Sequence, residues 1–108
     1  MNAAEPVRDH LAHAQFHARE HPTGIGAAVV ETRFKDGAHV WDCIVADGHE
    51  WHYVRVVGRG VGPFPNISAE DVEQGIEQFA ATLPEPDRLR HLLNANPLHI
   101  DGNGTVSD

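Results

Sequence analysis

Apolar residues recur at helical spacing near the start of the chain. They fall three or four positions apart and would share one face of a helix: Val7, Leu11, Ala14 and Ala18. We predict this helix over residues 6–20, because proline is acceptable in a first helical turn and the His-Pro-Thr-Gly segment at 21–24 would end it.

Three runs rich in β-branched and aromatic residues follow, at 25–34, 39–46 and 51–57. Asp36-Gly37 and Asp47-Gly48 separate them, and Asp-Gly pairs favour tight reversals because both residues tolerate positive φ. The pattern predicts an antiparallel meander with the run 39–46 in the centre.

Alternation of side chains predicts which faces of these strands are buried. In the third run, one face would carry Trp51, Tyr53, Arg55 and Val57, and the other, buried face would carry His52, Val54 and Val56. In the central run we favour Trp41, Cys43 and Val45 as inward over the competing set Val40, Ile44 and Ala46.

Two helices are predicted in the second half of the chain. A glycine- and proline-rich loop at 58–67 leads to Ser68 and Asp71, which approximate a capping box for a helix to about Leu83. The core face of that helix would carry Val72, Ile76, Phe79 and Leu83. A Pro-Glu-Pro break then precedes a short helix over 87–94.

These elements predict one α+β domain spanning residues 1–108, in the order α-β-β-β-α-α, with the two C-terminal helices packed on one sheet face. Residues 98–100 would add a short strand or pack under the helices. Residues 1–5 and 101–108 are expected to be flexible tails.

Charge narrows the range of partners. Sixteen acidic against eight basic residues give a net charge of -8, which disfavours nucleic acid and anionic membranes. The order helix, three strands, helix over about residues 6–83 resembles that of double-stranded-RNA-binding domains. Those domains present lysines where this chain has the acidic residues of 68–73, so we expect no RNA binding.

Cys43 is the only cysteine, and no secretion signal or apolar span is visible. A lone cysteine cannot form an intrachain disulfide, which predicts a reducing compartment and hence the cytoplasm. The residue lies between apolar neighbours, where cysteine usually acts as a small hydrophobic group.

The first helix carries an unusual row of histidines: His10, His13, His17 and His21. Their spacing places them on one flank of the helix, about 90° from its apolar line. Neutral imidazole is a good ligand for zinc or nickel, but a structural site needs about four ligands from more than one element. We therefore predict weak metal capture at most, and no required cofactor.

A second group of candidate binding residues lies on and after the third strand: Trp51, Tyr53, Arg55, Arg59 and Phe64. Aromatic rings and arginine are typical of protein contacts. The glycines around Arg59 would also offer backbone amides to an anion.

The absence of a recognisable catalytic motif favours a small non-enzymatic interaction protein of the inhibitor, immunity or adaptor type, with a protein partner that is basic. The alternative is a domain that binds a small ligand or a metal through the histidine row or the Arg55–Arg59 glycine loop. A homodimer through an unpaired edge strand is a further expectation, because three strands leave two edges.

Overall fold

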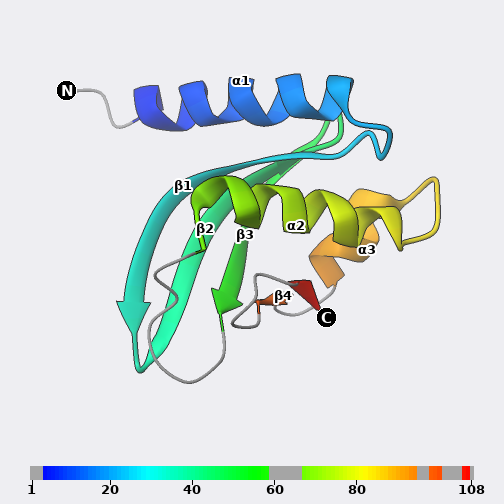
Figure 1. Cartoon of the computed structure of the whole chain (residues 1–108). Helices are drawn as coiled ribbons and strands as arrows, with labels where there is room; N and C mark the ends of the chain where they lie inside the picture. The colour runs from blue at the N-terminus through cyan, green and yellow to red at the C-terminus, as the bar shows by residue number, and fades with distance from the viewer. Residues whose placement is uncertain (1–3, 59–66, 95–97, 101–105, 108) are drawn as a thin grey trace.

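The elements follow the predicted order and are extended at the C-terminal end by two short strands (Figure 1). The computed structural model describes residues 4–58, 67–94, 98–100 and 106–107. The helices and strands are α1 (Ala4–Glu20), β1 (Gly26–Lys35), β2 (Ala38–Ala46), β3 (Trp51–Gly58), α2 (Ala69–Ala81), α3 (Arg88–Asn94), β4 (Leu98–Ile100) and β5 (Val106–Ser107). Arg59 and Phe64 lie outside the described residues.

The predicted meander is confirmed, with β2 between β1 and β3. Asp36 and Gly37 form the first turn with positive φ values of 53° and 81°, and Gly48 has a φ of 99° in the second. Both turns therefore use the left-handed backbone that glycine and aspartate tolerate best.

Two short strands cover the far edge of the meander. β4 pairs in parallel with β3, from Val56 and Leu98 to Gly58 and Ile100, and β5 pairs with β4. Residues 98–100 thus form a strand, which was one of the two options that the sequence allowed. Residues 106–107, expected in a flexible tail, are instead the outermost strand, whereas 101–105 lie outside the described residues.

The main core lies between the sheet and the two C-terminal helices. Inward residues from the strands include Trp41, Cys43, Val45, Val54 and Val56. Helix α2 adds Val72 and Ile76, and α3 adds Leu89 and Leu92. The helices pack on one sheet face as predicted. His52, expected on this buried face, is exposed; it is the second residue of β3, where the strand begins.

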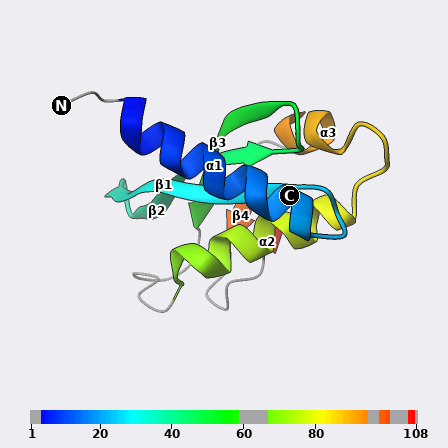
Figure 2. The same ribbon diagram turned by 90° about the horizontal axis from the view of Figure 1, so that it is seen from above.

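A smaller core lies on the opposite face, under α1, and contains Ala14, Ala28, Ile44 and Ala46. A helix therefore covers each face of β2, which explains why both of the competing residue sets of this strand are buried. Seen from above, α1 lies over the sheet, and α2 runs beside α1 (Figure 2).

The approach of α1 to β1 depends on Gly26. A Cβ at this position would lie 2.1 Å from the backbone oxygen of Ala14 and 2.3 Å from the backbone nitrogen of Ala18. Only glycine lets the two backbones come this close. The contact holds α1 against the outer strand, with His17 directly above it.

β1 also contains a bulge. The register shifts between Val29 and Glu31, so Val30 is an extra residue without a partner on β2. A bulge interrupts the ladder and redirects the backbone at the edge of a sheet. Near this bulge, at the outer edge of β1, side chains of α1 contact side chains of α2.

Candidate functional site

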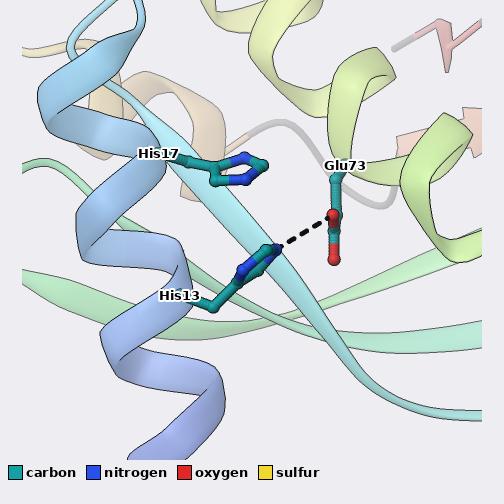
Figure 3. Close-up of side chains that lie close together, drawn as sticks. All are labelled: His13, His17 and Glu73. Carbon is teal, nitrogen blue, oxygen red and sulfur yellow. Dashed lines mark hydrogen bonds and ion pairs between the residues drawn. The ribbon is translucent and has the colours of Figure 1, made fainter.

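Histidines of α1 face buried glutamates of α2 across the outer edge of β1. We call this group the His–Glu ladder: His13, His17 and His21 from α1, with Glu73 and Glu77 from α2. The two helices run in the same direction (Figure 1), so residues four apart on one helix meet residues four apart on the other. Figure 3 shows His13 and His17 directed toward Glu73.

The closest contacts of the ladder involve Glu77. Its Oε1 atom lies 3.2 Å from Nδ1 of His17, and its Oε2 atom lies 2.9 Å from Nε2 of His21. One carboxylate is thus shared by two imidazoles a helical turn apart. The contact between His13 and Glu73 is longer, with Nε2 of His13 at 3.4 Å from Oε2 of Glu73.

Glu73 is oriented by the backbone of the sheet. The amide of Val29, at the bulge in β1, donates a hydrogen bond of 3.0 Å to Oε1 of Glu73. The other oxygen of the carboxylate is directed toward His13. A hydrogen bond of this kind fixes the direction in which a ligand group presents its free oxygen.

The two glutamates are unusual in their burial. Glu73 is 8% exposed and Glu77 is 4% exposed. Burial raises the pKa of Glu77, and the hydrogen bond with His17 and the charge of His21 offset only part of this effect. Among the described residues, the ion-pair partners of these glutamates are imidazoles, with no lysine or arginine. The carboxylates therefore lack a permanent positive charge beside them.

Two overlapping sets of side chains bring three ligand atoms close enough for one metal ion. The first set is His13, His17 and Glu73, and the second is His17, His21 and Glu77, with the ligand atoms of each set within 4.8 Å of one another. His10, the first member of the predicted row, belongs to neither set. The ring centroids of His13 and His17 are 4.2 Å apart and those of His17 and His21 are 5.5 Å apart, so the row is continuous.

The sequence pointed to three of the five ladder residues and missed both glutamates. Acidic residues on a helix normally face solvent, and Glu73 and Glu77 lie beside rather than on the apolar line of α2. The available signal was their spacing of four, which repeats the spacing of His13, His17 and His21.

The other predicted binding residues lie elsewhere. Trp51 and Tyr53 are 42% and 51% exposed. They lie on the sheet face that carries α1, paired with Ala46 and Ile44, on the part of it formed by β3. Arg55 lies on the same face, where its Nε donates a 2.9 Å hydrogen bond to Asp42, a carboxylate also bound by Arg33. These residues form a surface separate from the ladder.

Cys43 occupies the core, as its apolar neighbours predicted. Burial raises the pKa of its thiol far above the usual range. The residue is therefore a packing group with no nucleophilic thiolate.

Known proteins supply no further guide to the site. No protein-family model matches the chain, and no curated protein or solved structure shows significant similarity to it. In the part of the chain that the structure describes, no helix has both the length and the apolar character needed to cross a bilayer.

Proposed function

We propose that this protein binds a divalent transition-metal ion of the zinc, cobalt and nickel class at the His–Glu ladder. The observation that carries the proposal is the pair of buried glutamates faced by three imidazoles from another helix. Imidazole nitrogen and carboxylate oxygen are the donors that this class of metal accepts. Glu77 of α2 would add a ligand from a second element to the imidazoles of α1, which supports the proposal.

The distances favour a metal ion between His17, His21 and Glu77. Ligand atoms at about 2.0 to 2.1 Å from a tetrahedral zinc ion are about 3.3 Å from one another. The separations around Glu77 are 3.2 Å from its Oε1 to Nδ1 of His17 and 2.9 Å from its Oε2 to Nε2 of His21, and the ligand atoms of the whole set lie within 4.8 Å of one another. This set is also less exposed than the one containing His13, whose side chain is 47% exposed.

Charge supports the same assignment. Two desolvated carboxylates close together are costly unless a cation accompanies them. Histidine supplies positive charge only in its protonated form. A divalent ion would supply the missing charge over the whole neutral range and leave the histidines neutral.

The test is zinc titration by calorimetry at pH 7.5 in the wild type and in single variants. We expect one saturable site that His17→Ala and Glu77→Gln each weaken by about 100-fold, because loss of a ligand should cost at least as much as loss of a group that only orients a ligand. His10→Ala is the matched control, from the same helix and histidine row but outside the ladder, and it should change affinity by less than about twofold. Equal binding by His17→Ala and wild type would reject the proposal.

A second proposal retains the interaction module expected from the sequence. It is supported by the exposure of Trp51, Tyr53 and Arg55 on one face of β3. The partner would be a basic protein attracted by the net charge of -8. The proposed location is the cytoplasm, because a single cysteine cannot form an intrachain disulfide. Loss of partner capture with Trp51→Ala, at unchanged zinc affinity, would separate this surface from the ladder.

A further inference from the structure

A hollow of about 400 Å³ opens beside the His–Glu ladder. Its walls come from the turn after α1, with His21, Pro22 and Thr23, and from one side of α2, with Gln74, Glu77, Gln78 and Ala81. His21 and Glu77 therefore belong both to the hollow and to the ladder. A volume of this size lies within the range of pockets that hold small molecules.

We propose that a metal ion held by His17, His21 and Glu77 keeps one coordination position open toward this hollow, where it binds a small carboxylate or hydroxamate carrying a compact apolar group. This inference rests on the proposed metal site. Three protein ligands leave a tetrahedral ion one position short, which is the arrangement of zinc sites that accept water or a substrate.

The placement of the ligands sets the direction of the open position. His21 and Glu77 line the hollow, whereas His17 does not, so His17 stands behind the ion as seen from the hollow. Glu73 does not line the hollow, and its carboxylate is engaged by the amide of Val29 and by His13. The side that remains for an external ligand is the one that faces Pro22 and Ala81.

The walls determine the class of ligand. They are mainly carbon surface, to which Pro22 and Ala81 contribute, and this surface suits an apolar group. Gln74 and Gln78, one turn apart on the exposed side of α2, add amide groups that donate and accept hydrogen bonds. An oxygen-donor head is the natural partner of the open position on a zinc-class ion.

The experiment uses the full chain loaded with Co²⁺, whose visible absorption reports changes in coordination. Benzohydroxamate and acetohydroxamate are titrated separately into the wild type, Ala81→Phe and Ala12→Phe. Ala81→Phe would fill the hollow at a residue that is not itself a metal ligand, and Ala12→Phe places the same side chain on an exposed position of α1 outside the hollow. Equilibrium dialysis follows the Co²⁺ that stays on the protein.

We expect a saturable spectral change with Co²⁺ retained, and benzohydroxamate binding about tenfold more tightly than acetohydroxamate because it buries the larger apolar surface. Ala81→Phe should weaken benzohydroxamate about tenfold while leaving Co²⁺ affinity within about twofold, and Ala12→Phe should resemble the wild type.

Three outcomes would overturn the inference. Co²⁺ binding with no response to either hydroxamate would leave the metal site intact but refute the open position. Equal benzohydroxamate affinity in Ala81→Phe and wild type, or removal of Co²⁺ from the protein by hydroxamate, would refute the hollow as the ligand site. Failure to bind Co²⁺ at all would refute the proposed function itself.

Discussion

Asp42 is a carboxylate held inside the sheet by two arginines, and it shows how a charged residue is accommodated in a central strand. It is 6% exposed and is bound by Arg33 and Arg55 from the two neighbouring strands. Burial alone would raise the pKa of Asp42, but the hydrogen bonds from the arginines outweigh it, and the pKa lies below its usual value. The ionised form is therefore stabilised by folding.

The lowered pKa predicts how stability depends on acid. The contribution of Asp42 is fully present above the unfolded value of 3.8 and is lost as the pH falls through the lower, folded value. Asp42→Asn should reduce the free energy of unfolding at neutral pH by about 1 to 3 kcal/mol and should remove this part of the acid sensitivity. Urea denaturation across the acid range measures both effects.

The control for this prediction is Asp36→Asn, at an exposed turn position whose positive φ asparagine tolerates. It should leave both quantities nearly unchanged. A variant at Asp42 that loses stability equally at every pH would show that packing, and not charge, dominates there.

At the scale of elements, the close crossing of α1 over Gly26 sets the position of the histidines relative to α2. Gly26→Ala forces a Cβ into the helix backbone, so α1 must shift outward. We expect a loss of about 1 to 3 kcal/mol in the free energy of unfolding, as for other overpacking changes. Zinc affinity should fall as well, because His17 moves away from Glu77. Calorimetric titration and chemical denaturation check the two effects.

Gly24→Ala provides the comparison. Its Cβ would meet no atom within 4 Å, but its φ of 74° is unfavourable for alanine and costs roughly 1 to 2 kcal/mol. This variant should lose stability while keeping its zinc affinity. If the two variants bind zinc equally well, the position of α1 does not control the site.

The elements were largely predictable because their signals are local. Periodicity placed α1, Asp-Gly pairs placed both turns, and Ser68 with Asp71 forms the expected capping box at the start of α2. The bulge at Val30 was not predictable, because valine is an ordinary strand residue and nothing in the local sequence marks the register shift. The burial of Glu73 was also not predictable, because its partner is the amide of Val29, 44 residues away in the sequence.

At the scale of the whole molecule, the ladder joins segments 60 residues apart in the sequence. A metal ion there would act as a crosslink that binds the folded state and not the unfolded chain. At a free zinc concentration 100 times the dissociation constant, the gain in stability is about 2.7 kcal/mol. For a domain of this size we expect the melting temperature to rise by about 10 °C or more, reversibly with a chelator.

Thermal unfolding followed by circular dichroism, with and without zinc, measures this shift. Ca²⁺ should give none, because it prefers a larger set of oxygen ligands than the ladder offers. An equal zinc-induced shift in His17→Ala would mean that the ion binds elsewhere on the chain.

The bond between Glu73 and the amide of Val29 has a consequence for contact between molecules. β1 is the first strand of the sheet, and a free amide on such a strand invites the backbone of a second copy to extend the sheet. Glu73 occupies that donor from within the same chain. Removing this carboxylate would leave the amide of Val29 without its acceptor. We therefore expect a variant without Glu73 to add strands between molecules at this edge and to form fibrils.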